Sequence, residues 1–314
     1  NFSRIEFFDS TKVYFFLKER EVDMAATIAE ARKWPKPPYD PVKSTTVITF
    51  HLMAILGVVL WYYEKIDVSW WTIVFAVVWF QLTSFGVTAG YHRLFAHPTY
   101  KAATILKVFL LLLGAAAFQG PALIWAALHR AHHWFGDTER DPYCILRGKR
   151  HAHMGWVMRR TFPDLKLVKD LLKDRLVCWQ NKFDIPLELS MCFGVPALIG
   201  WAWGEVAGSL FVAGFIRLVI QWHLTFSVNS VAHWWGENKW LPENTSRATS
   251  WIVSCFLGGE GRRHDWHHFV DSKDYRVGGL FDPDFAKWFI WVCWFFGLAW
   301  DLRRYEPEHL EQAT

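Results

Sequence analysis

The sequence predicts an all-α integral membrane protein of four transmembrane helices, with a cytosolic helical cap that holds a histidine-ligated metal site. Hydrophobic residues make up 52% of the 314 positions, and several apolar stretches are about long enough to cross a bilayer. The 21 tryptophans favour a membrane protein, because Trp concentrates at the boundary between water and lipid. Nine of the 14 histidines fall into four tight groups, which indicates metal binding.

The chain opens with a polar arm and then alternates between apolar stretches and charged segments. Residues 1–43 are polar and charged, and the run Trp34-Pro-Lys-Pro-Pro38 cannot continue a helix, so we expect a cytosolic arm. The main domain is expected to cover residues 44–304, followed by a tail at residues 305–314. Its predicted parts are membrane spans at residues 45–63, 70–90, 186–203 and 206–231, and a cytosolic cap at residues 91–185 and 232–304.

A further apolar stretch at residues 102–128 is not expected to cross the membrane. His97 and His129 flank it, and a single crossing would place these two histidines on opposite faces. If both belong to one metal site, the stretch must lie along the interface or pack against the protein. The segment from Phe285 to Trp300 is almost wholly apolar, but its 16 residues are short for a span, so we expect an interfacial or packed helix there.

The distribution of positive charge predicts the orientation in the membrane. Residues 130–182 contain twelve Lys and Arg, whereas the turns at 64–69 and 204–205 hold one Lys between them. By the positive-inside rule the histidine side is cytosolic. The net charge of +4 is too small to indicate nucleic-acid binding, and five cysteines without paired spacing predict no disulfide framework and a reducing compartment. Gln81 and Arg217 lie within predicted spans, and we expect them to form hydrogen bonds between helices.

Two of the histidine groups share one spacing. His129-Arg-Ala-His132-His133 and His264-Asp-Trp-His267-His268 both read H-x-x-H-H, and positions i, i+3 and i+4 share one face of a helix. Each group could therefore aim three imidazoles at one point. Imidazole binds Fe, Zn, Cu and Ni without adding negative charge, and nine imidazoles are enough for two ions. The remaining five are expected to be ordinary core or surface residues: His51, His151, His153, His223 and His309.

The first group, His92 and His97, has a different spacing. A separation of five residues would not leave both rings on one face of an ideal α-helix. Pro98 disfavours the helical conformation at His97. We therefore expect His92 to point from the last turns of a helix and His97 to turn back from its end.

At these residues the chain resembles the membrane fatty acid desaturases, specifically the stearoyl-CoA desaturase-like delta-9 group. The resemblance covers roughly residues 44–304. The matching motifs are, in order, Thr88-Ala-Gly-Tyr-His-Arg-Leu-Phe-Ala-His97, then His129-Arg-Ala-His-His133 with Asp137-Thr-Glu-Arg-Asp-Pro142, then Asn229-Ser-Val-Ala-His233, and Gly259-Glu-Gly261 before His264-Asp-Trp-His-His268.

The resemblance implies a non-haem di-iron site that uses O2 as co-substrate. The family activity is the introduction of a cis double bond, usually between carbons 9 and 10 of a saturated acyl chain, here expected on acyl-CoA. No acid or base of the protein can break such C–H bonds, so no catalytic residue is expected beyond the metal site. Asn229 would carry a water that completes one iron, and the implied iron ligands are His92, His97, His129, His132, His133, His233, His264, His267 and His268.

The resemblance also implies residues that bind substrate and support the ligands. By position, Phe80 and Ser84 match the tunnel end, and Trp125 and Trp156 match tryptophans near the tunnel or its mouth, with core packing as the competing explanation. Arg160 matches a basic residue that contacts the phosphates of CoA. Four carboxylates are expected to orient ligand imidazoles, or else to be solvated loop charges or helix caps: Asp137, Asp141, Glu260 and Asp265.

The chain departs from the family pattern at three places. Ala127-Leu128 and Gly120-Pro121 replace the Arg-Asp and Asn-Asp of animal acyl-CoA members, so several CoA contacts are missing. An acyl-lipid or an acyl-carrier protein is therefore an alternative substrate. The residues Arg262-Arg263 precede the last group where the family normally has one residue, an insertion that could shift His264.

Partners and rival functions follow from the same residues. This sequence contains no haem motif, so we expect a separate electron donor: cytochrome b5 with its reductase in an endoplasmic reticulum membrane, or ferredoxin in a bacterial cytoplasmic or plastid membrane. The basic segment 130–182 could steer an acidic donor. A histidine-box fatty acid hydroxylase would use the same ligands. A membrane metal transporter would place ligands within its spans, and a soluble zinc hydrolase is disfavoured because no H-E-x-x-H occurs.

Overall fold

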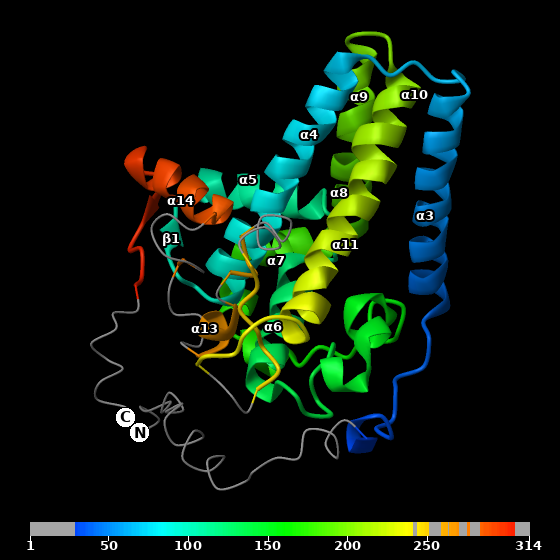
Figure 1. Ribbon diagram of the computed structural model, residues 1–314. Coiled ribbons are helices and arrows are strands. Elements are labelled where there is room, and N and C mark those ends of the chain that lie inside the picture. The colour runs from blue at the N-terminus through cyan, green and yellow to red at the C-terminus, as the bar shows by residue number, and fades with distance from the viewer. Residues whose placement is uncertain are drawn as a thin grey trace, which may run out of the picture.

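The computed structural model describes residues 29–240, 244–250, 259–262, 264–269, 275–276 and 283–304. Within these residues the protein is mostly helical, with one antiparallel pair of short strands, β1 (Lys101–Ala102) and β2 (Ala299–Trp300). The long helices stand side by side as one bundle, and shorter helices lie across it or gather at one of its ends (Figure 1).

Three continuous helices are long and apolar enough to cross a membrane. They are α3 (Pro41–Tyr62), then α4 (Trp70–Phe85) continued by the π-helix η1 (Gly86–Ala96), and then α10 (Val206–Ser209), η7 (Leu210–Ile216), α11 (Arg217–Ser230) and η8 (Val231–His233) joined end to end. The first begins four residues before the predicted span at 45–63, because Asp40 caps it by accepting from the backbone N–H groups of Val42 and Lys43.

The predicted span at residues 186–203 is less simple. Its residues form α8 (Asp184–Leu189), η6 (Ser190–Gly194) and α9 (Val195–Trp201), which qualify as a span only together with α7 (Arg175–Lys182). The two parts are bent by 81°. The described residues therefore contain three candidate spans, or four if this bent pair is one span.

The stretch at residues 102–128 breaks into two short helices, α5 (Thr104–Ala115) and α6 (Ala122–Phe135). Phe118 and Gly120 take positive φ values of 51° and 81° in the turn between them. Twelve and fourteen residues are too few to span a bilayer, as expected for a stretch that does not cross. The C-terminal apolar segment likewise forms an 11-residue helix, α14 (Phe285–Phe295), which lies beside the bundle at a steep angle to the long helices (Figure 1).

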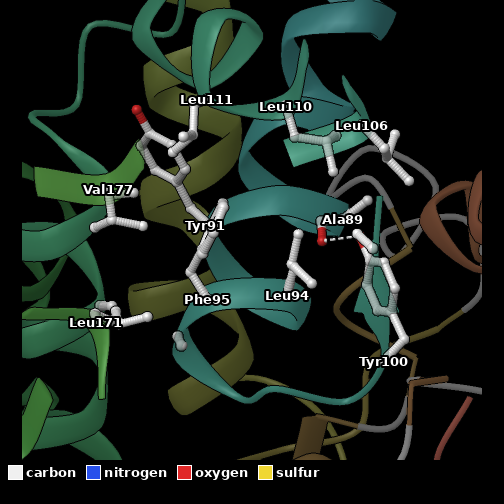
Figure 2. Close-up of a cluster of buried hydrophobic side chains, with 14 of the residues drawn as sticks. Ala89, Tyr91, Leu94, Phe95, Tyr100, Leu106, Leu110, Leu111, Leu171 and Val177 are labelled. Atoms are coloured by element: carbon white, nitrogen blue, oxygen red, sulfur yellow. Dashed lines mark hydrogen bonds between the residues drawn. The ribbon is translucent and has the colours of Figure 1, made fainter. Parts of the chain in front are cut away.

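The main core joins η1 to α5 and to the cap helices. Tyr91, Leu94 and Phe95 of η1 point toward Leu110 and Leu111 on α5 and toward two cap side chains, Leu171 and Val177 (Figure 2). The Tyr100 hydroxyl donates to the carbonyl oxygen of Ala89 at 2.8 Å. Gly86 and Gly114 permit the close approach, because a Cβ on Gly86 would overlap the backbone of Gly114. This packing holds the end of η1 against the cap.

The cap is built from short elements around α6. They are η2 (Ile145–Arg147), η3 (His151–Gly155), η4 (Leu165–Val168), η5 (Leu171–Lys173) and α13 (His264–Phe269). The two polar side chains predicted within spans, Gln81 and Arg217, differ in their contacts. Arg217 is buried and donates to Gln221, to the Ala116 carbonyl and to the sulfur of Cys192, whereas Gln81 lines a cavity. The cysteines of the described residues are free thiols, and Cys255 lies outside those residues.

Candidate metal centre

All nine histidines of the four groups lie within the described residues and meet where η1, α6, η8 and α13 converge. Each offers a ring nitrogen, and two sets have these nitrogens within 4.8 Å of one another. The first set is His92, His97, His129 and His267, and the second set is His132, His233 and His268. Residues separated by up to 175 positions, such as His92 and His267, therefore share one place in the fold.

The other two histidines complete these sets. The ring of His133 lies 4.6 Å from that of His97 and 4.8 Å from that of His267 in the first set, and 4.3 Å from that of His268 in the second. It follows His129 by one helical turn on α6, and its buried Nε2 has no hydrogen-bond partner among the described residues. The Nε2 atom of His264 lies 2.9 Å from that of His233 and 3.2 Å from that of His268. The insertion before His264 thus leaves it in the centre. We call the five-histidine set with His133 the first half and the four-histidine set with His264 the second half.

The expectation that each H-x-x-H-H group aims three imidazoles at one point is wrong. Both groups are helical, on α6 and α13, but each divides between the two halves. In each group the i and i+4 histidines enter one half, and the i+3 histidine enters the other. The reason is angular: on an α-helix the side chains at i+3 and i+4 diverge by about 100°. His132 consequently reaches the second half from α6, and His267 reaches the first half from α13.

The spacing of His92 and His97 has a structural explanation that the sequence did not supply. Segment Gly86–Ala96 is π-helical, and the backbone N–H of His97 donates to the carbonyl oxygen of His92 at 3.0 Å, the i to i+5 bond of such a helix. The two rings lie 4.9 Å apart. His97 turns back from the helix end as predicted, and the wide turn, in addition to Pro98, brings it beside His92.

The nitrogen-to-nitrogen distances fit ligands that share an ion. Nε2 atoms of paired histidines face each other at 2.8 Å for His97 and His129, 3.0 Å for His92 and His267, and 3.2 Å for His132 and His233. Two imidazoles bound at a typical 2.0–2.1 Å and at right angles have nitrogens about 3.0 Å apart. Both halves could therefore hold a transition-metal ion of the kinds that imidazole favours, which include Fe, Zn, Cu and Ni.

The protonation state also suits metal binding. Burial, followed by repulsion from neighbouring histidines, lowers the pKa of five ring systems well below the ordinary value of 6.5: His97, His129, His133, His267 and His268. The same causes lower the pKa of His264 to about 3. Neutral imidazoles at physiological pH leave the Nε2 lone pairs free for a cation.

Four side chains anchor the second ring nitrogens. The Nδ1 atom of His132 lies 3.0 Å from a carboxylate oxygen of Asp141, and that of His129 lies 3.1 Å from the Tyr143 hydroxyl. In the second half, Nδ1 of His233 also lies 3.0 Å from the Thr245 hydroxyl. Such partners fix the tautomer and the orientation of a ligand ring.

Glu260 is the fourth anchor and belongs to a buried ion network. One of its oxygens lies 3.4 Å from Nδ1 of His92, and the other accepts from Arg93 at 2.7 Å. Arg93 is fully buried and also pairs with Asp284 at 2.9 Å and donates to the carbonyl oxygen of Tyr275. Burial alone would raise the pKa of Glu260, but the charge of the Arg93 guanidinium and its hydrogen bond outweigh burial and hold the pKa low. Glu260 is therefore an anionic anchor.

The other two predicted carboxylates behave differently. Asp137 acts through Thr245, whose hydroxyl and backbone N–H both donate to it, at 2.6 and 2.7 Å. Asp265 contacts no imidazole: one oxygen accepts from the backbone of Lys239 at 3.0 Å, and the other has no partner among the described residues. The expectation for Asp265 is wrong, because its position on α13 turns the side chain away from the histidines.

Sequence reasoning missed three supporting residues. Arg93 had a usable signal, since a charged residue at the end of an apolar span marks a functional position. Tyr143 and Thr245 had none, because their roles arise from hydrogen bonds to His129 and His233 across intervening turns.

A cavity of about 610 Å³ reaches the centre. Its lining is mostly apolar, and His92, His129, His264, Asn229 and Glu260 all contribute to it. The predicted substrate residues Phe80, Ser84, Trp125 and Trp156 also line it. Arg160 does not: it is exposed, although its neighbour Thr161 lines the cavity. Gly120, Pro121 and Leu128, which depart from the family pattern, belong to the wall as well.

Comparison with known proteins agrees with this arrangement. Residues 68–275 match the fatty acid desaturase family. A probable acyl-CoA desaturase of Schizosaccharomyces pombe is 37% identical over 77% of this chain, and the chain spans about half of that relative, 51%. An acyl-CoA Delta(11) desaturase of Trichoplusia ni is 35% identical over 86% of this chain and 79% of its own length. The stearoyl-CoA desaturase of Sus scrofa is 34% identical, with coverage of 91% and 81%.

Proposed function

The chain belongs to the fatty acid desaturase family, and from this premise we propose that it is a di-iron enzyme that introduces a cis double bond, between carbons 9 and 10, into the saturated acyl chain of an acyl-CoA. The observation that carries the proposal is the apolar cavity, about 610 Å³ in volume, whose wall includes histidines of both halves of the centre. A pocket of this size suits an elongated apolar ligand. It would bring a methylene pair beside the metal ligands.

We propose that the two halves each hold one iron. His92, His97, His129, His133 and His267 would bind the first, and His132, His233, His264 and His268 the second, with a water carried by Asn229. When bound, the irons supply the activation of O2 that hydrogen removal from an unactivated methylene requires. The neutral imidazoles leave the positive charge of the ions uncompensated, apart from the anionic anchors Asp141 and Glu260.

The protein's own residues would hold the substrate and exclude water. Apolar side chains of the cavity, Trp125 and Trp156 among them, surround an acyl chain and keep the reacting carbons dry. Phe80 and Ser84 on α4 would set how far the chain enters. Arg160, which is exposed next to the cavity residue Thr161, would contact a phosphate of CoA outside the cavity.

The most specific part of the proposal is the position of the double bond in the acyl chain. The relatives differ here, since the Trichoplusia ni protein is named a Delta(11) desaturase and the Sus scrofa protein a stearoyl-CoA desaturase. The position would depend on the distance between the metal centre and the end of the cavity, which we propose that Phe80 and Ser84, two of its lining residues, form. An acyl-lipid or acyl-carrier protein would be the substrate if the Gly120-Pro121 and Leu128 wall does not admit acyl-CoA.

The partners follow from the reaction. Reduction of O2 needs electrons from a donor, which we propose to be cytochrome b5 with its reductase, or ferredoxin. The candidate spans place the protein in a membrane, proposed to be the endoplasmic reticulum in a eukaryotic cell, with the metal centre on the cytosolic side.

Expression in a desaturase-deficient cell tests the proposal. Mass spectrometry of the cell's lipids should show double bonds at carbon 9, and these should disappear in the His132→Ala variant. Double bonds at carbon 11 would contradict the position while leaving the activity. Hydroxylated chains without double bonds would contradict desaturation.

A further inference from the structure

Three histidines outside the centre form a chain on the flank of the bundle. His51 on α3 and His223 on α11 face each other with their Nε2 atoms 3.2 Å apart, and Nδ1 of His223 lies 2.9 Å from Nε2 of His153 in η3. The outer nitrogens are also engaged. Nδ1 of His51 contacts the carbonyl oxygen of Val47 at 2.7 Å, and Nδ1 of His153 contacts the Ser230 hydroxyl at 3.0 Å. Three separate elements thus meet through imidazoles that the metal centre does not use.

The protons in this chain do not suffice for its contacts. A neutral imidazole carries one N–H, and a serine hydroxyl carries one O–H, so three histidines and Ser230 supply four protons. The contacts number five, because Ser230 also donates to the carbonyl oxygen of Phe226 at 3.1 Å. With every ring neutral, one contact has no proton.

A cation between His51 and His223 removes the shortage. Nδ1–H of His51 then donates to Val47, and Nδ1–H of His223 donates to His153. His153 donates in turn to Ser230, whose hydroxyl remains free to donate to Phe226. Every contact is satisfied, and both Nε2 lone pairs point at the ion. A ligand ring whose second N–H donates to a carbonyl oxygen or another acceptor is the usual arrangement in metal sites.

The distance between the two nitrogens agrees with this assignment. The 3.2 Å between His51 and His223 equals the separation of His132 and His233, and of His268 and His264, in the metal centre. The missing proton could instead be supplied by protonation of one of the three rings, which would make that imidazole a cation. Burial lowers the pKa of His153, which opposes a positive charge in the chain.

We propose that His51 and His223 bind one divalent transition-metal ion of borderline softness, such as Zn²⁺, with His153 as a positioning residue and water at the remaining positions. His153 faces the other nitrogen of His223, so the three rings do not converge on one point. His223 is exposed and His51 partly exposed, so the facing nitrogens lie near the surface of the bundle. His153 belongs to η3, outside the candidate spans, whereas His51 and His223 lie within them.

The ion would link the first candidate span to the last beside the cavity wall. The ring of His51 lies 6.2 Å from that of Trp222, and Trp222 lines the cavity. The site shares no histidine with the proposed irons, and its occupancy does not depend on the desaturase reaction.

Equilibrium dialysis of the iron-loaded protein in lipid nanodiscs against buffered Zn²⁺ tests the site, with zinc and iron counted in the same sample by mass spectrometry. Wild-type protein should take up one zinc per chain with its iron unchanged. His51→Gln and His223→Gln should each weaken zinc binding by more than about tenfold, and His153→Gln should weaken it less. Ile220→Ala, an exposed position on the same helix as His223, is the matched control and should bind zinc normally.

Zinc uptake that persists in both His51→Gln and His223→Gln would overturn the site, as would zinc that enters only by displacing iron. A spectroscopic measurement covers the case in which the variants do not fold. Electron paramagnetic resonance of the wild-type protein with one added Cu²⁺ should show coupling to two imidazole nitrogens, and a signal without nitrogen coupling would contradict the proposal.

Discussion

The two halves of the metal centre are held in different ways. In the first half, His92 is anchored by Glu260, which a fully buried arginine, Arg93, ties to Asp284, 191 residues farther along the chain. In the second half, His132 is anchored by Asp141, only nine residues away. The Glu260 anchor therefore depends on distant segments that meet in the core, whereas the Asp141 anchor lies within one short stretch of the chain. Removing an anchor should have different consequences in the two.

The largest effect is expected from removing a ligand of the second half. On the proposed di-iron assignment, His132→Ala deletes the imidazole that α6 contributes to that half, so bound iron should fall from two toward one per chain. Desaturation should fall by more than the roughly 10–100-fold that loss of a hydrogen-bond partner of a ligand costs. Iron analysis and product formation measure this. His151→Ala is the control, since His151 lies in the cap outside both halves. Two irons retained in the His132 variant would contradict the assignment.

The anchors provide a sharper test of the difference between the halves. Glu260→Gln leaves the buried Arg93 with one carboxylate fewer, so it should lower the free energy of unfolding by up to about 3–5 kcal/mol as well as weaken iron binding. Asp141→Asn should weaken iron binding by about 10–100-fold with a smaller loss of stability. Denaturant unfolding and iron titration measure both quantities. Equal losses of stability would show that the halves are held alike.

Acid should destabilise the metal-free protein. Burial lowers the folded-state pKa of six histidines of the centre below 6.5: His97, His129, His133, His264, His267 and His268. At acidic pH the unfolded chain therefore binds more protons than the folded protein. The free energy of unfolding should thus fall as the pH drops below about 6.5 and continue to fall toward the depressed folded values. Thermal unfolding between pH 7.5 and 5 measures this. A midpoint that does not change with pH would contradict neutral, buried rings.

The smallest effect is expected from a substitution in the cavity wall, outside both halves of the metal centre. Ser84→Leu narrows the cavity on α4, so the enzyme should prefer shorter acyl chains, with a several-fold change in relative rates and no loss of iron. Product profiles from mixed acyl substrates measure the shift. Val77→Leu, an exposed position on the same helix, should leave the profile unchanged. An unaltered profile in the Ser84 variant would remove Ser84 from the acyl path.

The sequence was sufficient where local spacing decides the outcome. The H-x-x-H-H groups predicted helices that carry metal-binding histidines, and α6 and α13 have this form. The flanking positions of His97 and His129 predicted that residues 102–128 do not cross, and the structure divides them into helices too short for a span. The candidate spans number three or four, since the bend between α7 and α8 cannot be read from hydropathy.

The contacts between the histidines and their partners could not be predicted from the sequence, because they depend on how the helices cross. The sequence could not assign each histidine to a half, because that depends on which partner helix faces it. Thr245 and Tyr143 gave no pattern, since a hydroxyl becomes an anchor only when a ring nitrogen comes within hydrogen-bond distance. His51, His153 and His223 were interpreted as ordinary residues for the same reason, and they lie in three separate elements.

Residue chemistry and short-range spacing thus indicated the metal-binding side chains and the helices that carry them, and the resemblance of the histidine motifs indicated the family. Clustered imidazoles indicate a metal site, and a spacing of three or four residues keeps side chains on neighbouring parts of a helix surface. Only the packed structure decided the division into five and four histidines, the anchors from remote segments and the cavity beside them. Those features arise from contacts between residues far apart in the chain, whose geometry is set when η1, α6, η8 and α13 pack together.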